Sequence, residues 1–342
     1  MAELDLTYFT SPEVMEAADE ESTEKNALIQ SGAVVDDPVL RERAASKSQH
    51  LTLPWNDLID YDEEPDYMNT DPSVSSTPLD MTGSDASVMV AYQHKSWQIA
   101  RMVARITRQR DPAGALVSML AGYRMAREQR RLVASLKGIV ADNIANDGGD
   151  MVNSIYSDVA AGSITAAMRP SLDAIIDTGL TSGDRRNLYG IMVAHSITVA
   201  NLEKLDAAGF TMQKDSAGMM PDIKTYRGML VLEDDQMPVI AGTNSPQYYT
   251  FLLGSGSIGR AMAPLTERMK ESEIHSDPAA ANGAGIDVYH YRWASCLNPY
   301  GIDFTSDTVS AKSPTIADLE LAVNWDRKVP RKLVQIACLA HN

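Results

Sequence analysis

A glycine-rich run at Gly254–Gly259 is the residue pattern with the clearest chemical meaning in this sequence. Its letters, Gly-Ser-Gly-Ser-Ile-Gly, fit the G-x-G-x-x-G pattern that lets a backbone approach a dinucleotide pyrophosphate. The run follows an expected strand at 248–253, but the pattern also requires a helix that begins at the third glycine and holds the phosphates. Pro264 arrives five residues after Gly259 and leaves room for barely one helical turn. We therefore expect a glycine-rich turn at a subunit edge and no cofactor, with a dinucleotide-binding enzyme as an alternative.

The histidines and acidic clusters form no recognisable catalytic or metal-binding pattern. No two histidines have the spacing that two metal ligands on one helix require, and H-E-x-x-H is absent from the sequence. His195 and Ser196 are adjacent, so they point to different faces of an expected helix and cannot act as base and nucleophile. We expect His195 to be packed or hydrogen-bonded, and Glu233-Asp234-Asp235 to be a solvated turn. The six histidines are His50, His94, His195, His275, His290 and His341.

No phosphate loop and no nucleophile elbow occurs either. The sequence therefore predicts no catalytic, cofactor-binding or metal-binding residues, and we do not expect an enzyme.

Cys296 and Cys338 are the only cysteines, and we expect two buried thiols. The chain has no run of about twenty apolar residues and no signal-peptide pattern, so we expect a soluble protein made in a cytoplasm.

The net charge of −16 is concentrated at the N-terminal end of the 342 residues. Residues 1–90 contain twenty acidic and four basic side chains, which account for the whole excess. A group of arginines follows between positions 101 and 131, and we expect the acidic arm to pair with it, within or between subunits. Nucleic-acid binding is an alternative without a supporting motif. The arginines are Arg101, Arg105, Arg108, Arg110, Arg124, Arg127, Arg130 and Arg131.

One long helix is expected at 111–146, and the other elements are arranged around it. Asp111 is a good N-cap, Pro112 suits the first helical position, and the glycines after Asn146 end the helix. At 1.5 Å per residue it spans roughly 50 Å. Small residues recur along one row of this helix, which is tolerable if another backbone packs closely across them. They are Gly114, Ser118, Gly122, Ala126, Ala134 and Gly138.

The region before this helix is expected to depend on other parts of the structure. Composition predicts disorder for residues 1–50. Alternating or apolar runs at 51–55 and 87–92 predict the two strands of a long flap with an irregular tip. An isolated hairpin is marginal in water, so the flap needs a surface to lie on. Residues 97–106 are expected to form a short amphipathic helix that leads into the long one.

The region after Gly148 alternates helices and strands, which indicates an α+β protein. Helices are expected at 171–178 and 315–323. A further helix, capped by Asp184, is expected to carry Leu188, Ile191, Met192, His195, Val199 and Leu202 on one side. Strands are expected at 226–232, 248–253, 286–293 and 333–339.

Six stretches, taken in order, resemble the major capsid proteins of tailed bacteriophages with the Hong Kong ninety-seven type fold. The resemblance is strongest from 171 to 301, and the arm, flap and long helix upstream support it. Asn298 stands where a histidine is expected before the proline, which leaves the fold prediction intact. The stretches are Gly183-Asp184, Met192–Ser196, Ile223–Val231, Asp234–Pro238, Tyr248–Ile258 and Asn298–Gly301.

The resemblance implies an α+β phage major-capsid fold with an N-terminal arm, an extended β-hairpin loop, a long spine helix in a peripheral domain, and an axial domain. The implied segments are an N-terminal arm at 1–50, the extended loop and lead-in helix at 51–108, the peripheral domain with spine helix at 109–165, the axial domain at 166–285, and a return to the peripheral domain at 286–342.

The resemblance also implies a function, that of a structural coat protein whose copies form hexamers and pentamers of an icosahedral shell around double-stranded DNA. The implied partners are other copies of the chain, portal and scaffolding proteins, and a decoration protein. The DNA is enclosed without sequence-specific binding. The implied location is the virion, after synthesis in the host bacterial cytoplasm and without a membrane. The alternatives are a bacterial nanocompartment shell with the same fold and the dinucleotide-binding enzyme. Covalent cross-linking is not implied, because no matching lysine–asparagine pair is identifiable.

Overall fold

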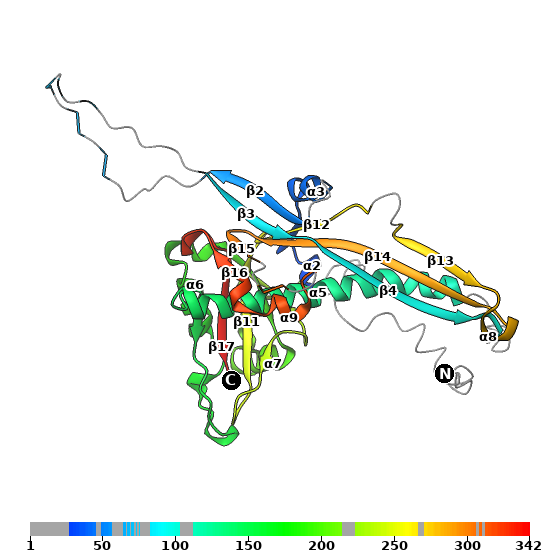
Figure 1. The fold of residues 1–342 in the computed structure, drawn as a ribbon. Helices are drawn as coiled ribbons and strands as arrows, with labels where there is room; N and C mark the ends of the chain where they lie inside the picture. Colours follow the sequence, from blue (N-terminus) through cyan, green and yellow to red (C-terminus); the bar gives the residue numbers. More distant parts are fainter. Residues whose placement is uncertain are drawn as a thin grey trace.

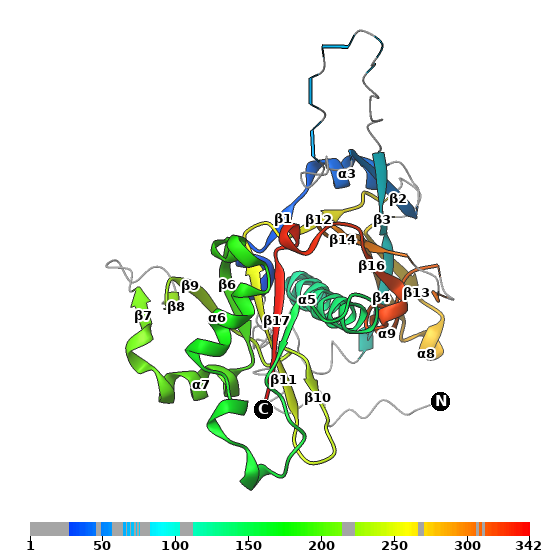
Figure 2. The ribbon, with the colours of Figure 1, turned by 90° about the vertical axis from the view of Figure 1, so that its left-hand side faces the viewer.

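The structure is a computed structural model that describes most of the chain. The longer described ranges are 27–45, 49–56, 83–102, 112–213, 223–265, 270–305 and 312–342. Residues 64–65, 67–68, 70–71, 73, 75 and 308–309 are described as well. The structure is a mixed α+β fold in which a long helix runs beside two sheets (Figures 1 and 2).

The long helix α5 (Pro112–Asn146) confirms the expected element. Leu132 and Leu136 are fully buried in a core that also contains Phe251. At Gly138 a side-chain carbon would overlap the backbone of the segment that crosses the helix at 319–325, so the expected close approach is confirmed there. The N-cap predicted at Asp111 lies outside the described residues.

An eight-stranded sheet covers one side of the core at the C-terminal half of α5 (Figure 2). Its order is β5-β17-β11-β6-β9-β8-β7, with β10 paired to β11. The strands are β5 (Val152–Ser154), β6 (Tyr189–Ala194), β7 (Phe210–Gln213), β8 (Ile223–Tyr226), β9 (Met229–Glu233), β10 (Val239–Ile240), β11 (Gln247–Gly254) and β17 (Ile336–His341).

The expected helix that starts at Asp184 is wrong. A short 3₁₀ turn at Gly183–Leu188 leads into strand β6, and the helix α7 (Ser196–Leu205) begins only afterwards. β6 is antiparallel to β11 and parallel to β9, and only Gly190 within it is exposed. Hydrogen bonding on both edges and burial on both faces favour an extended chain over the helical periodicity.

The expected single strand at 226–232 is also wrong, because the chain reverses in the middle of it. β8 and β9 are antiparallel, and the turn between them holds Arg227 at φ 48° and Gly228 at φ 89°. Two consecutive positive φ values are the geometry of a tight hairpin turn. The strand expected at 248–253 is confirmed as β11, and the helix expected at 171–178 is confirmed as α6 (Leu172–Leu180).

A second sheet lies along the N-terminal half of α5 (Figure 1). The helix expected at 97–106 is wrong for residues 97–100, which belong to strand β4, and 103–106 lie outside the described residues. β4 pairs with β14 over ten residues, and Trp97 packs edge-on against Tyr123 of α5 with ring centroids 5.5 Å apart. The strands are β1 (Val34–Asp36), β4 (Ala91–Ala100), β12 (Ile258–Met262), β13 (Ser272–Asp277) and β14 (Ile286–Pro299), and the short helix α8 (Ala280–Gly283) lies between β13 and β14.

The predicted flap is present as a two-stranded hairpin of β2 (His50–Asn56) and β3 (Gly83–Met89), paired from His50↔Met89 to Asn56↔Gly83. It points away from the rest of the molecule (Figures 1 and 2). Most of the expected irregular tip lies outside the described residues.

The C-terminal region contains shorter elements than expected. The helix expected at 315–323 is α9 (Ile316–Leu319) followed by a 3₁₀ turn, and a capping box between Thr315 and Asp318 starts it. A small two-stranded sheet of β15 (Ile302–Phe304) and β16 (Trp325–Arg327) precedes β17. No helix in the described part of the chain is both long and apolar enough to span a membrane.

Residues 27–45 are folded, so the prediction of disorder over 1–50 is wrong for this part. Helix α2 (Ala27–Gln30) buries Leu28 in the core beside α5. β1 then pairs in parallel with β12, and helix α3 (Pro38–Ala45) buries Leu40. A few apolar side chains are sufficient to fold this acidic segment onto the core, because burying each of them contributes about 1.5–3 kcal/mol.

Asp37 holds this segment to the fold, and replacing it tests the attachment. Its Oδ1 accepts the backbone N–H groups of Val39 and Leu40, and its Oδ2 accepts the hydroxyl of Tyr300 at 3.1 Å. We expect Asp37→Ala to lower the free energy of unfolding by about 1–2 kcal/mol in urea titrations, because it removes a helix N-cap and leaves Tyr300 without this bond. The exposed neighbour Asp36 is the control, and an Asp36→Ala variant as destabilised as Asp37→Ala would contradict the role given to Asp37.

Candidate assembly interface

The glycine-rich run forms a turn between two strands. β11 ends at Gly254, Gly256 has φ +68°, and β12 begins at Ile258, where the dinucleotide pattern requires a helix. The Gly256 N–H donates to the carbonyl of Gly32, and that of Ile258 to Ala33. The turn therefore holds the N-terminal segment of its own chain, and its geometry does not supply the helix N-terminus that a pyrophosphate needs.

The acidic cluster after β9 differs in part from its prediction. Asp234 is only 4% exposed and accepts hydrogen bonds from the Gln129 side chain and the Gln236 N–H, so the expected solvated turn is wrong for this residue. His195 caps α7 by accepting the Ile197 N–H at 3.2 Å, which confirms a hydrogen-bonded role.

The other polar candidates are also accounted for. Cys296 and Cys338 are buried and free, as expected, and burial raises the pKa of the Cys296 thiol to about 12. Over the described ranges, no three His, Cys, Asp or Glu side chains are placed to hold one metal ion.

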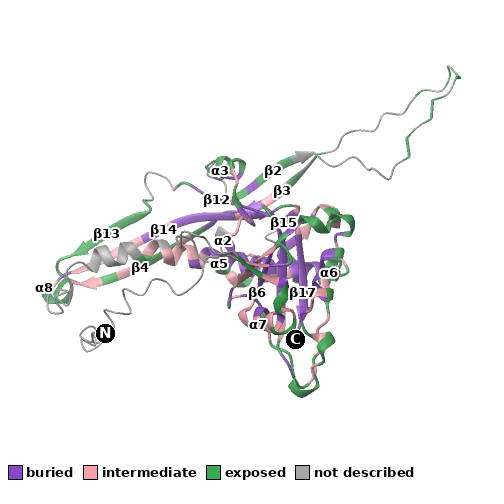
Figure 3. Cartoon of the chain, turned by 180° about the vertical axis from the view of Figure 1, so that it is seen from behind, coloured by how far each residue is buried: buried purple, intermediate pink, exposed green. Residues whose placement is uncertain are grey.

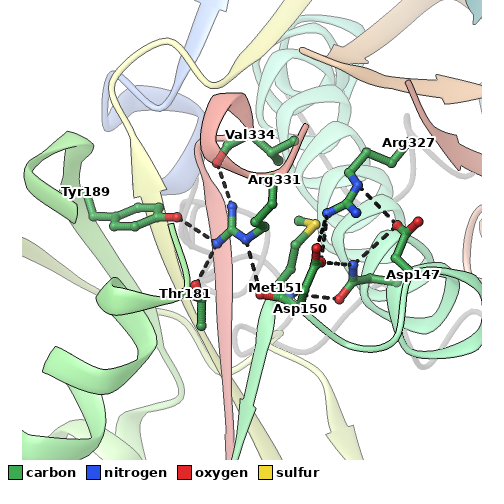
Figure 4. Close-up of polar contacts among 9 residues, drawn as sticks. Asp147, Asp150, Met151, Thr181, Tyr189, Arg327, Arg331 and Val334 are labelled. Carbon is green, nitrogen blue, oxygen red and sulfur yellow. Dashed lines mark hydrogen bonds and ion pairs between the residues drawn. The ribbon is translucent and has the colours of Figure 1, made fainter. Parts of the chain in front are cut away.

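Two arginines before β17 join the C-terminal end of α5 to the eight-stranded sheet (Figure 4). Arg331 donates to the carbonyl of Val334 at 2.8 Å, to the hydroxyl of Thr181 at 2.7 Å and to that of Tyr189 at 2.8 Å. Its Nε also donates to the backbone carbonyl of Asp150. One guanidinium therefore contacts the turn after α5, the end of α6 and the start of β6.

Arg327 completes this joint on the side of the helix. It pairs with Asp147 at 3.3 Å and with Asp150 at 2.7 Å. Burial alone would raise the pKa of Asp150, but hydrogen bonds from Arg327 and Asn143 hold it below its usual value. The joint fixes the direction of the long helix relative to the sheet.

A buried carboxylate lies at the base of the flap, where β15 contacts β3. Asp303 is 4% exposed and accepts the backbone N–H of Ser87. Burial, opposed by this bond and by Lys328, raises the pKa of Asp303 to about 6. The base of the flap therefore contains a group that titrates near neutral pH.

The Asp303 carboxyl gives a testable pH dependence. The pKa of this carboxyl is higher in the folded protein than in the unfolded chain. Its contribution to the free energy of unfolding is therefore fully present below about pH 4, where it is protonated in both states, and is lost as the pH rises through about 6. We expect Asp303→Asn to match the wild type closely at pH 4 and to be more stable by about 3 kcal/mol at pH 7, because Asn stays neutral. Urea titrations at several pH values measure the difference, and equal stabilities at pH 7 would count against a buried ionised carboxylate.

The projecting elements are largely exposed, as are α6 and the loops beside the eight-stranded sheet (Figure 3). All six residues of β13 are exposed, including Ile274 at 59%. Beyond the flap strands, Tyr67 and Met68 are exposed by 81% and 104%. Such apolar side chains on thin projections have no core of their own to enter.

A groove of about 910 Å³ lies between α3, α5 and the β12–β14 region. Arg41, Arg124, Lys270 and Arg292 line it, together with Glu42 and Glu271. Arg124 pairs with Glu271 at 3.3 Å. The pairing predicted between the acidic arm and the arginines stays a prediction. Residues 1–26 of the acidic arm lie outside the described residues.

Comparisons with known proteins agree with this architecture. No family model matches the chain. The sequence is 26% identical over 325 residues to the major capsid protein of Bacillus phage SPP1, across 94% of this chain and 92% of that protein. The capsid of cyanophage Pam1 superposes with a TM-score of 0.54 at 13% identity, over 82% of this chain and 88% of that one. The capsid of Ralstonia phage GP4 gives 0.52 at 11% identity, over 82% and 85%.

The chain has the fold of phage major capsid proteins. This confirms the resemblance and the α+β fold class inferred from the sequence. Within the capsid fold, the joint around Arg331 and the buried Asp303 were not found by sequence analysis. The two acids that follow the helix, Asp147 and Asp150, were the available signal for a basic partner, but nothing in the sequence indicates which arginine pairs with them.

Proposed function

We infer that the chain is a structural major capsid protein of a bacteriophage and a component of the virion. The observation that carries this inference is the match to the SPP1 major capsid protein, which extends over nearly the whole of both chains. The phage-capsid fold supports it. The geometry at Gly254–Gly259 disfavours the enzyme alternative, because β12 stands where a phosphate-binding helix would begin.

We further propose that copies of the chain form hexamers and pentamers that close an icosahedral shell around double-stranded DNA. Portal and scaffolding proteins, and a decoration protein, are proposed partners, and the host bacterial cytoplasm is the proposed place of synthesis. The DNA would be enclosed without sequence-specific contacts. The support is the shape of the subunit, since its thin projections expose apolar side chains that a neighbouring copy would cover.

The domain boundaries implied by the family stay a proposal, with one revision. We propose that α5 and the β4–β14 sheet form the peripheral domain and that the eight-stranded sheet forms the axial domain. β5 and β17 pair inside the eight-stranded sheet, so we assign them to the axial domain although they lie outside 166–285.

The direct test is electron microscopy of the purified chain together with size-exclusion chromatography. We expect closed shells of uniform diameter, or capsomers that convert to shells when a scaffolding protein is supplied. Particles are also isolated from cells and their contents are identified. Enclosed DNA supports the phage capsid, whereas an enclosed enzyme supports the nanocompartment. A protein that stays monomeric at all concentrations contradicts the proposal.

Replacing residues 57–82 with an Asn-Gly turn tests the role of the flap in assembly. We expect the melting temperature to change by less than a few degrees, because the described residues of this segment are exposed, while shell formation is lost. The matched control replaces 214–222, the connection between β7 and β8, with the same turn. Normal shells from the 57–82 variant would show that the flap is dispensable.

A further inference from the structure

Two histidines meet on the outer face of the β4–β14 sheet, away from α5. Trp97 and Trp293 both lie on the face toward Tyr123 of α5. Side chains alternate between the faces of a strand, so His94 and His290, each three residues from one of these tryptophans, lie on the opposite face. They are diagonal neighbours, because His94 is paired with Arg292 and His290 with Ser96.

The two rings approach edge to edge. His94 Nε2 lies 3.1 Å from His290 Nδ1, the ring planes are 22° apart, and the centroids are 5.3 Å apart. One nitrogen donates a hydrogen bond and the other accepts it. His94 is exposed and His290 is partly exposed, so solvent reaches the pair.

This separation is also suitable for joint ligation of a metal ion. Zn–N distances are about 2.0–2.1 Å, so two imidazole nitrogens in a tetrahedral shell lie about 3.3 Å apart. For both rings to bind one ion, the neutral ring that donates the hydrogen bond moves its proton to the outer nitrogen, and the rings turn so that both lone pairs point at the ion. No proton is lost overall.

We propose that His94 and His290 form a binding site for a divalent transition-metal ion that links β4 to β14. The described residues place no third imidazole, thiol or carboxylate with them, so water completes the coordination. The carboxylate of Glu273, which lies across from His290 on β13, balances the charge of Arg292 at 3.0 Å. The repulsion between Arg292 and an incoming cation is therefore reduced. This site does not depend on the proposed capsid function.

The test uses the full-length chain and Zn²⁺ in a non-chelating buffer at pH 7.5. We expect calorimetry to show one ion per chain at micromolar affinity, weakened about tenfold or more in His94→Ala and in His290→Ala. His275→Ala is the matched control, because His275 is an exposed histidine of β13 on the same face, paired with Val288, and the described residues do not place it with the pair as a third ligand. Its affinity should equal that of the wild type.

Two further measurements separate loss of ligands from loss of fold. Without metal, all three variants should keep the melting temperature of the wild type within a few degrees, since exposed substitutions have small effects. Added Zn²⁺ should raise the melting temperature of the wild type and of His275→Ala only. Wild-type affinity in both pair variants, no binding by the wild type at ~1 mM Zn²⁺, or an equal loss in His275→Ala would each overturn the site.

Discussion

Gly138→Ala should destabilise the protein by more than about 3 kcal/mol, although alanine favours a helix over glycine by about 1 kcal/mol. The added carbon would overlap the carbonyl oxygen of Leu319 and lie 2.5 Å from the indole Nε1 of Trp325. These two groups are hydrogen-bonded to each other at 2.8 Å, so neither can move without losing its partner. Thermal and urea unfolding of the purified variant measure the loss.

The control for Gly138→Ala is Gly190→Ala in β6. No atom lies within 4 Å of the position that its side-chain carbon would take, and its φ is not positive. We expect a change within about 0.5 kcal/mol, or a small gain. If both variants lose the same free energy of unfolding, close packing across α5 at Gly138 does not explain the loss in Gly138→Ala.

Arg331→Met should cost about 3–4 kcal/mol, because it breaks a partly buried network and leaves several acceptors without a donor. Thr181, Tyr189 and the carbonyl of Val334 each lose a bond of 2.7–2.8 Å. Methionine preserves much of the packing of the side chain, so the effect measures the lost hydrogen bonds. Arg331→Lys should recover only part of the stability, since one ammonium cannot reproduce the planar fork of donors.

The neighbouring Lys332 provides the control for Arg331. Its ion pair with Asp184 spans 3.4 Å between side chains that are 65% and 78% exposed, and such pairs contribute little. We expect Lys332→Met to stay within about 0.5 kcal/mol of the wild type. Urea titrations measure the free energy of unfolding of both variants. If Arg331→Met is as stable as Lys332→Met, the hydrogen bonds of Arg331 do not contribute measurably to the stability of the fold.

The elements that sequence analysis found correctly are those with strong local signals. α5 has a proline at its start and glycines after its end, and β11 is a continuous apolar run before a glycine. The flap was also recognised, because a polar excursion separates two β-like runs. Its second strand was predicted at 87–92, whereas β3 ends at Met89 and Ala91 begins β4.

The two helix errors share one physical cause, which is that long-range pairing overrides local periodicity. The apolar positions of β6 also fit a helical stripe, and only hydrogen bonds to β9 and β11 on its two edges decide for a strand. The residues at 97–100 were assigned to a helix for the same reason, and their pairing with β14 corrects it. Composition predicted disorder for 27–45, but Leu28 and Leu40 find buried positions that no local pattern reveals.

The sequence by itself determined the fold class, the long helix, the flap and the resemblance to phage capsid proteins, because each depends on order along the chain and on local propensity. Only the tertiary structure decided the partners of Arg331, the burial of Asp234 and Asp303, and the meeting of His94 with His290. Apart from the local bonds of Arg331 to Val334 and of Gln236 to Asp234, these contacts join residues from about 100 to 220 positions apart. Their energy depends on burial and on distances of a few ångströms, which a linear sequence does not specify until the strands are in register.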